Sequence, residues 1–240
     1  MGRSIEVLLG PPWPTDVVRD AHVAVVDVLR AMTTIATALH AGAAGVIPAA
    51  DAADAMALGQ RLGRDRVVLC GERESEHIEG FDLDNSPASF TPETVAGKTL
   101  IMATTNGTRA MRAVSGATSV RAAALVNRSA VADALAHEDG DVFIVCAGES
   151  GAFAFEDAIG AGALVDALLT SIADVELRDG ARAAALLYRA VASRLDDAIA
   201  SADHAQHLAR KGFARDITRC AALDTLDVAP VLRDGILVSG

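Results

Sequence analysis

Short apolar runs alternate with longer Ala-rich stretches along most of the chain. Runs of four to eight apolar residues bounded by polar or glycine residues are typical of buried strands, and apolar residues spaced three and four apart are typical of helices. The runs predict strands over residues 5–9, 22–29, 46–48, 66–70, 100–103, 120–125 and 141–147, with one or two more between 227 and 238. Helical patterns lie between them, over residues 35–42, 51–63, 127–137 and 158–172, from residue 109, and from residue 180 onward.

This alternation predicts an α/β fold, with helices packed on a largely parallel or mixed sheet. The chain has 240 residues and shows neither a low-complexity linker nor a clear domain boundary. We therefore expect a single domain over residues 1–240, and a division into two lobes stays open.

One strand end carries a dense polar motif. The apolar run 100–103 stops at Thr104, Thr105, Asn106, Gly107 and Thr108, and a helical pattern follows directly. Free backbone N–H groups and the positive end of a helix dipole bind anions at such a turn, glycine permits close approach, and threonine supplies short donors. The alternative is that Thr108 or Asn106 merely caps the helix.

The same construction occurs earlier in the chain. A shift of 74 residues aligns Thr34 with Thr108 and Val46 with Val120. Both segments predict a strand, a Thr-rich turn, an Ala-rich helix, Gly-Ala and a second strand. Repeated strand–loop–helix units of this kind would bring two Thr-rich turns to one edge of a sheet.

Asp27 is a charged residue at the C-terminal end of the apolar run 22–29. A buried carboxylate needs a partner, a metal ion or a raised pKa, and the C-terminal ends of strands form the ligand crevice of open α/β sheets. A structural ion pair with Arg30 is the competing interpretation. We favour a functional role for Asp27.

A second acidic feature follows the run 141–147, where Glu156 and Asp157 stand near the start of a helix. They either favour the helix dipole or supply oxygen ligands to Mg²⁺. Gly160 and Gly162, just beyond them, lack a third glycine and suit close packing better than dinucleotide binding. His204 and His207 are interpreted as surface residues.

Composition and charge argue against several classes of function. The net charge of −11 argues against nonspecific nucleic-acid binding, and an anionic substrate would need a metal ion or placed arginines. The three cysteines have no metal-type spacing and are expected to be structural. Because the N-terminus lacks a signal-peptide pattern and no apolar stretch is long enough to span a bilayer, we expect a cytoplasmic protein without membrane contact. Ala-rich helix faces leave homo-oligomerisation open.

Several motifs occur in a fixed order: DVLRAMTTIATAL (27–39), GER (71–73), GFDLDNSP (80–87), TTNGT (104–108), AG…GAFAFED…GAG (147–162) and S-x-x-H…L…GF…DI…C (201–220). With them the chain resembles, over nearly its full length, the 2-phosphosulfolactate phosphatase family of Mg²⁺-dependent acid phosphatases tied to coenzyme M biosynthesis. Asp84 stands where that pattern has Gly, and Ala154 where Ser is frequent. Asp84 adds a negative charge beside the expected site.

The resemblance implies a three-layer α/β/α sandwich and hydrolysis of 2-phosphosulfolactate to 3-sulfolactate and phosphate. In the mechanism that the residues allow, carboxylates hold Mg²⁺, threonines and an arginine cradle the phosphoryl group, and a polar loop reads the sulfonate or carboxylate end. The expected catalytic residues are Asp27, Arg30, Glu72 and Asn106. The expected metal ligands are Asp27, Glu72, Glu156 and Asp157. The expected phosphate- and substrate-binding residues are Thr33, Thr34, Arg73, Asn85, Ser86, Thr104, Thr105, Gly107 and Thr108.

Three questions stay open at this point. No Asp-x-Asp-x-Thr motif surrounds Asp27, so a phospho-aspartate of the haloacid-dehalogenase type has no support, and the choice between direct water attack and a covalent intermediate is not made. No general base is identified. The alternatives to the named activity are a phosphometabolite-binding sensor or scaffold without turnover, and the same chemistry on another small phosphoester.

Overall fold

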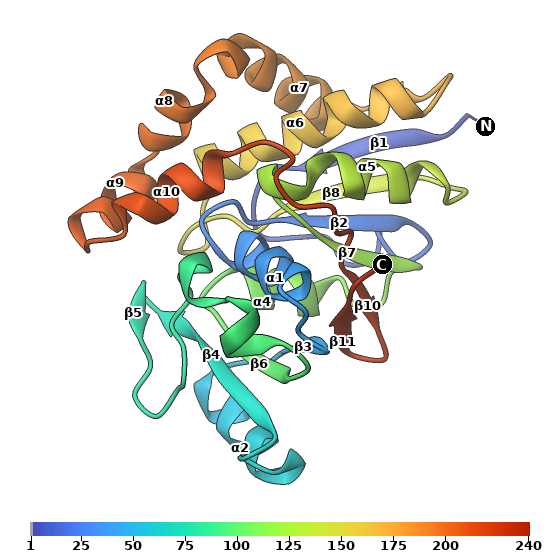
Figure 1. Ribbon diagram of the computed structural model, residues 1–240. Coiled ribbons are helices and arrows are strands. Elements are labelled where there is room, and N and C mark those ends of the chain that lie inside the picture. The colour runs from blue at the N-terminus through green and yellow to red at the C-terminus, as the bar shows by residue number, and fades with distance from the viewer. Residues whose placement is uncertain (1) are drawn as a thin grey trace.

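The computed structural model describes residues 2–240, whose strands and helices alternate along the chain (Figure 1). The strands are β1 (Ser4–Leu8), β2 (His22–Val26), β3 (Gly45–Pro48), β4 (Val67–Arg73), β5 (Glu76–His77), β6 (Thr99–Ala103), β7 (Ser119–Ala123), β8 (Val142–Cys146), β9 (Glu176–Leu177), β10 (Val231–Arg233) and β11 (Ile236–Val238). The helices are α1 (Ala31–His40), α2 (Ala52–Leu62), α3 (Pro92–Val95), α4 (Gly107–Ala113), α5 (Arg128–Ala136), α6 (Phe155–Ser171), α7 (Asp179–Val191), α8 (Leu195–Ala200), α9 (Asp203–Arg210) and α10 (Ala214–Ala221). Short 3₁₀ turns occupy Pro87–Ser89, Leu125–Asn127 and Ala192–Arg194.

The strands form one mixed sheet in the order β5-β4-β6-β3-β11-β10-β7-β2-β8-β1-β9. Two parallel blocks make up most of it: β4, β6 and β3 on one side, and β7, β2, β8, β1 and β9 on the other. The hairpin β10–β11 lies between them and pairs antiparallel with β7 and β3. The expected mixed, largely parallel sheet is confirmed, and the sequence tail 227–238 supplies both of the strands that join its blocks.

Alternate residues of the strands face helices on opposite sides of the sheet, which makes three layers. In β2, Ala24 and Val26 pack with α5, α6 and α7, whereas Val23 and Val25 pack with α1 and α4. A third, smaller cluster packs α2 against β4 and β6. Figure 1 shows α5, α6 and α7 gathered on one side of β1, β8 and β2, with α2 at the far end beyond β4.

The two repeated units cross between the parallel blocks. Helix α1 leads from β2 in one block to β3 in the other, and α4 leads from β6 back to β7. Because both crossovers start at C-terminal strand ends, the β2–α1 and β6–α4 turns lie on the same edge of the sheet, and Thr33 and Thr34 fall in the first turn of α1 rather than before it. The 74-residue shift thus corresponds to two equivalent strand–loop–helix–strand units.

Element boundaries differ from the sequence prediction at the polar turns. Strand β2 ends at Val26, so Asp27 follows the strand, and α4 begins at Gly107. Gly162 permits the close packing expected of it, because a Cβ there would overlap the carbonyl of Ala184 in α7. The three cysteines are free and buried, as expected of structural residues. Within residues 2–240 no helix combines the length and the apolar character that crossing a membrane requires.

Candidate active site

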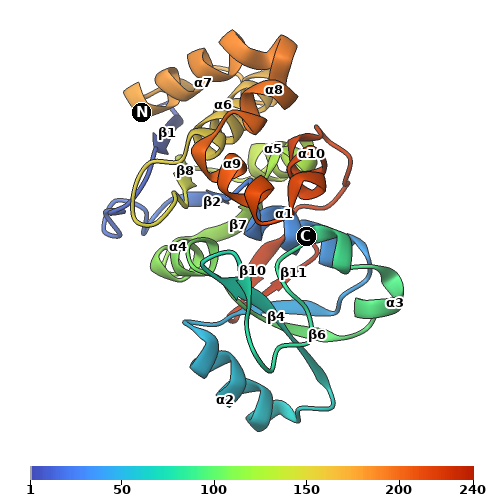
Figure 2. The same cartoon turned by 90° about the vertical axis from the view of Figure 1, so that its left-hand side faces the viewer.

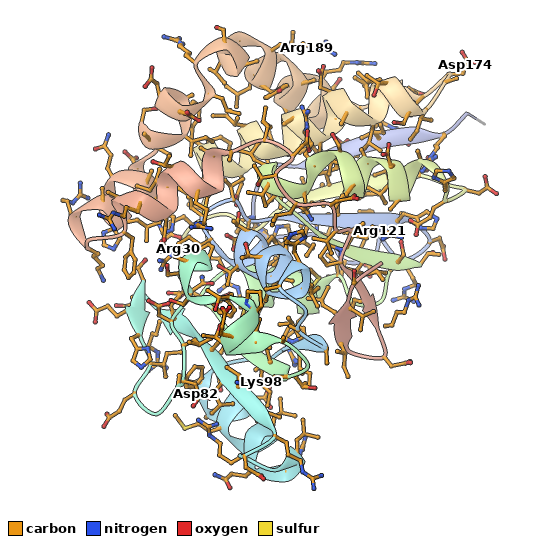
Figure 3. The ribbon with its side chains drawn as sticks, viewed as in Figure 1. Arg30, Asp82, Lys98, Arg121, Asp174 and Arg189 are labelled. Carbon is orange, nitrogen blue, oxygen red and sulfur yellow. The ribbon has the colours of Figure 1, made fainter. Side chains whose placement is uncertain are left out.

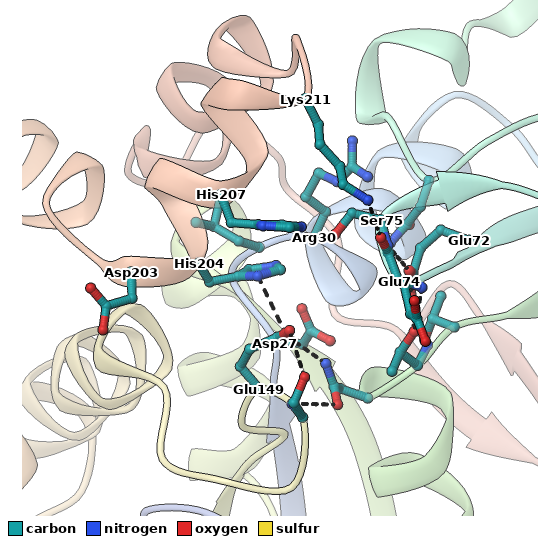
Figure 4. A pocket seen from close by; sticks show the side chains of 16 residues that line it. Asp27, Arg30, Glu72, Glu74, Ser75, Glu149, Asp203, His204, His207 and Lys211 are labelled. Atoms are coloured by element: carbon teal, nitrogen blue, oxygen red, sulfur yellow. Dashed lines mark hydrogen bonds and ion pairs between the residues drawn. The ribbon is translucent and has the colours of Figure 1, made fainter.

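A pocket of about 420 Å³ opens where β2, β4, β6 and β8 end. The turn after β2 contributes Asp27, Leu29 and Arg30; β4 and its hairpin contribute Glu72, Glu74 and Ser75; the remaining lining residues are Asn85, Thr104, Thr105, Asn106, Glu149, Ser150, Asp203, His204, His207 and Lys211. Figure 2 faces the side of the molecule on which α9 and α10 lie, and Figure 4 shows the pocket between α9 and the strand that carries Glu72. The pocket thus joins the C-terminal strand ends of both parallel blocks, where open α/β sheets bind ligands.

Asp27 lies at the floor of this pocket and is 5% exposed. Its Oδ1 accepts a hydrogen bond of 3.0 Å from the amide of Ala31. Gly107 belongs to the facing turn, and a Cβ at that position would lie 2.5 Å from Asp27 Oδ2. Glycine is therefore required at position 107 for the close approach of the two turns, whereas the sequence predicts that it permits the close approach of a ligand.

Burial, aided by the nearby charges of Glu72, Glu156 and Glu149 and opposed by the hydrogen bond from the Ala31 amide, raises the pKa of Asp27 to about 7. The competing interpretation, an ion pair between Asp27 and Arg30, is wrong. Arg30 instead pairs with Asp216 of α10, with 2.7 Å between Nη1 and Oδ2.

Glu72 ties β4 to the turn after β6. Its Oε1 accepts from the amide of Thr105 at 2.8 Å, and its Oε2 accepts from the amide of Ser75 at 2.6 Å. Asn106 links the same turn to β8, since its Nδ2 donates to Glu149 Oε2 at 2.7 Å. The turn after β6 is thereby held from both sides of the pocket.

The amides of this turn are less free than the sequence suggested. The Thr104 amide donates to the Thr108 hydroxyl at 3.2 Å, and the Thr108 amide donates to the Thr104 hydroxyl at 3.1 Å. With the Thr105 amide bound to Glu72, the amides of Asn106 and Gly107 remain without a hydrogen bond within residues 2–240. The capping alternative is wrong for Asn106, whose side chain makes no cap hydrogen bond.

Glu156 and Asp157 begin α6 behind the pocket and do not line it. Asp157 Oδ1 accepts from the amide of Val28 at 2.9 Å, and its Oδ2 accepts from the amide of Gly148 at 3.0 Å. Asp157 therefore joins the ends of β2 and β8. Burial raises the pKa of Glu156 to about 7, and burial together with the charges of Asp27 and Glu156 holds the pKa of Asp157 well above its ordinary value.

Several expected substrate contacts serve neighbouring backbone instead. The hydroxyls of Thr33 and Thr34 are fully buried and donate to the carbonyls of Val28 and Asn85, at 2.9 and 3.0 Å. Asn85 does line the pocket, and its buried Oδ1 has no hydrogen-bond partner among residues 2–240.

Arg73 is an expected contact that does not line this pocket. It lines a separate hollow with Met56 and Glu76. Successive residues of a strand point to opposite faces, so Arg73 and its neighbour Glu72 cannot both face one pocket.

The pocket contains more carboxylates than cations: Asp27, Glu72, Glu74, Glu149 and Asp203 against Arg30 and Lys211. Within residues 2–240, no three His, Cys, Asp or Glu side chains converge as a preformed metal cage. The chemistry of the pocket is that of hard oxygen donors, which suit a cation that keeps part of its water shell.

The chain is similar to known proteins over most of its length. A model of the family described as 2-phosphosulpholactate phosphatase matches residues 13–235. The chain belongs to this family. Proteins named "Probable 2-phosphosulfolactate phosphatase" are similar to it in Synechococcus sp. (44% identity, 93% of this chain and 94% of the relative), Caldanaerobacter subterraneus subsp. tengcongensis (42%; 91% and 90%) and Thermotoga petrophila (36%; 98% and 97%).

The sequence predicts no role in the site for several of the polar pocket residues, among them Glu149, His204, His207 and Lys211. His204 Nδ1 lies 3.4 Å from Glu149 Oε2, and the rings of His204 and His207 stack with centroids 6.4 Å apart. Burial lowers the pKa of His204, against the opposing charge of Glu149. The interpretation of the two histidines as surface residues is therefore wrong. Their spacing of three, with Lys211 four residues on, is the signal that places them on one helix face.

Proposed function

We propose that this chain is a divalent-metal-dependent phosphatase that hydrolyses 2-phosphosulfolactate to 3-sulfolactate and phosphate, and that Mg²⁺ is its metal. The observation that carries the proposal is the meeting of Asp27, Arg30 and the Thr104–Asn106 turn in one pocket of a member of this family. A volume of about 420 Å³ suits a small phosphoester.

The metal proposal rests on the donor set of the pocket. Mg²⁺ is typically held by one or two carboxylates together with water and substrate phosphate. Asp27 fits this requirement because its Oδ2 makes no hydrogen bond within residues 2–240, and Glu72 is the second carboxylate at the pocket wall. Asp157 fits it less well, since it does not line the pocket; an accepted backbone amide at each oxygen does not separate it from Glu72, which has the same. When bound, the ion would neutralise phosphoryl charge and polarise a water molecule.

The chain's own donors would bind and orient the phosphoryl group. Arg30 presents Nε and Nη2, which have no hydrogen-bond partner within residues 2–240. The Thr105 hydroxyl orients Glu72, since it donates to Glu72 Oε2 at 3.2 Å, and the amides of Asn106 and Gly107 supply neutral donors from the facing turn. Together Arg30 and these amides would hold the phosphoryl oxygens while the Asn85 amide contacts the remainder of the substrate.

A phosphate-release assay on purified protein tests the activity. With Mg²⁺ present, 2-phosphosulfolactate should be turned over faster than phospholactate, glycerol 2-phosphate and p-nitrophenyl phosphate, and EDTA should abolish turnover. Phosphate binding without release from any of them would instead support a sensor. Faster release from another phosphoester would keep the chemistry and change the substrate.

Three finer expectations stay predictions. A role in coenzyme M biosynthesis, a cytoplasmic location and self-association are checked by metabolite analysis of a deletion strain, by cell fractionation and by sedimentation, respectively.

A further inference from the structure

We propose that Asp216 and Phe213 are positioning residues that fix the guanidinium of Arg30 toward the phosphoryl site. The pair stands at the start of α10, in the GF…DI segment to which the sequence assigns no chemistry. The proposal rests on the proposed function, because it concerns how that pocket presents its arginine.

Two contacts hold Arg30 from one side. Asp216 Oδ2 lies 2.7 Å from Arg30 Nη1, and the Arg30 guanidinium carbon lies 4.1 Å from the centre of the Phe213 ring. The side chains of Arg30 and Asp216 are 2% and 5% exposed. An ion pair this deeply buried keeps both partners in one geometry, since leaving either unpaired costs far more than at the surface.

The remaining edge of the guanidinium is turned to the pocket. No hydrogen bond within residues 2–240 uses Nε or Nη2 of Arg30, yet neither nitrogen is sealed from solvent, unlike Nε of Arg121. Arg30 lies beside α10 with its side chain 2% exposed, whereas Arg189 lies at the outer surface of α7 with its side chain 52% exposed (Figure 3). An arginine whose planar fork is already oriented loses less entropy when it binds a phosphoryl group.

Ser86 belongs to the same assembly. Its hydroxyl donates to Asp216 Oδ1 at 2.8 Å, so each carboxylate oxygen accepts one donor. Ser86 was expected to contact the substrate, but it does not line the pocket. Its contact with Asp216 indicates that it acts on the substrate through Arg30.

Binding of inorganic phosphate, measured by calorimetry in the presence of Mg²⁺, tests the proposal without requiring turnover. Asp216→Asn should weaken phosphate binding by about tenfold or more, the scale seen when groups that orient a ligand-binding side chain are removed. Phe213→Leu, which keeps an apolar side chain, should weaken it less. In the hydrolysis assay both variants should raise KM for the phosphoester more than they lower kcat.

Asp224→Asn is the matched control, because it breaks another aspartate–arginine pair, with Arg128, at 2.6 Å and away from the pocket. It should lower stability and leave phosphate affinity within twofold. The decisive arm combines Asp216→Asn with Arg30→Lys: the double variant should bind phosphate no more weakly than Arg30→Lys alone, since Asp216 then has no guanidinium to orient.

Additive losses in the double variant would overturn the proposal. So would Asp216→Asn or Phe213→Leu proteins that lose stability and keep wild-type phosphate affinity. If Asp216→Asn does not fold, Phe213→Leu and Ser86→Ala decide the matter by the same affinity measurement. Wild-type protein that neither binds nor releases phosphate would overturn the proposed function itself, and with it the positioning role of Asp216 and Phe213.

Discussion

The turn between β2 and α1 and the turn between β6 and α4 occupy equivalent places in two repeated units, yet they bring different chemistry to one pocket. The first turn carries the charges of Asp27 and Arg30, and the threonines that follow it, Thr33 and Thr34, are buried in α1. The second carries no charge and exposes Thr104 and Thr105 to the pocket. Two topologically equivalent turns therefore contribute different groups to the pocket: charged side chains from the first and neutral hydrogen-bonding groups from the second.

The difference follows from the cost of burying charge. The charged turn is braced by residues far away in sequence: Asp157 binds the amide of Val28, and Asp216 binds Arg30. The neutral turn closes partly on itself through the reciprocal bonds of Thr104 and Thr108, and Glu72 and Glu149 accept its remaining donors from Thr105 and Asn106. A neutral turn can satisfy part of its polar groups locally, whereas buried charges require partners that the rest of the fold must supply.

The largest effect is expected at the charged turn. Asp27→Asn should lower kcat/KM more than about 100-fold, because losing a direct ligand should exceed the loss caused by removing its supporting groups. The fold should persist, since an asparagine oxygen still accepts the Ala31 amide and a buried carboxylate is removed. Phosphate release and thermal unfolding measure both quantities.

Asp166→Asn is the control for that variant, since it breaks an exposed ion pair with Arg189 on α6 and α7. It should leave turnover unchanged. If Asp27→Asn protein turned over substrate at close to the wild-type rate, Asp27 would have no part in the mechanism. The conclusion that the two turns contribute differently to catalysis would then be contradicted.

The next effect is a dependence of stability on pH. The pKa values of Asp27 and Glu156 are raised to about 7 in the folded chain and lie near 4 in the unfolded one. Between these values the folded state holds more protons, so the free energy of unfolding of the metal-free protein should fall as pH rises from about 4 to 7 and then level off.

Mg²⁺ should reverse this loss, because it binds the ionised carboxylates. Its addition should raise Tm more at about pH 8 than at about pH 5, and the difference should shrink in Asp27→Asn protein. Calorimetric scans with EDTA or Mg²⁺ measure it. Equal Tm shifts at both pH values would show that the ion binds elsewhere.

How much of this site the sequence predicts depends on the range of the contacts involved. Polar residues directly after apolar runs identify the turns, because strand ends follow from local pattern. The partner of Arg30 is 186 residues away, and no local pattern names it. The place of Arg73 outside the pocket was predictable from the sequence. Side chains alternate along a strand, so Arg73 faces away from its neighbour Glu72.

The two sets of threonines provide a milder test of the same comparison. Thr105→Val should raise KM between about twofold and tenfold, because the Thr105 hydroxyl donates to Glu72 Oε2 at 3.2 Å and its loss leaves that pocket carboxylate less well oriented. Stability should change little, because Glu72 keeps its bonds to the Thr105 and Ser75 amides. Thr34→Val should lower the free energy of unfolding by about 1–3 kcal/mol, because the carbonyl of Asn85 loses its donor. Kinetics and urea denaturation on both variants separate the roles, and a KM rise in Thr34→Val equal to that in Thr105→Val would contradict them.

The smallest effect is expected in the loop that supports the charged turn. Asp84 departs from the family pattern, and its Oδ1 accepts the amide of Ser86 at 2.9 Å and the hydroxyl of Ser89 at 3.2 Å, outside the pocket. Asp84→Gly should therefore lower the free energy of unfolding by about 1 kcal/mol and leave the preference for a sulfonated substrate over p-nitrophenyl phosphate unchanged. A shift in that preference would show that the carboxylate acts on the substrate by its charge, and that the charged turn extends to this loop.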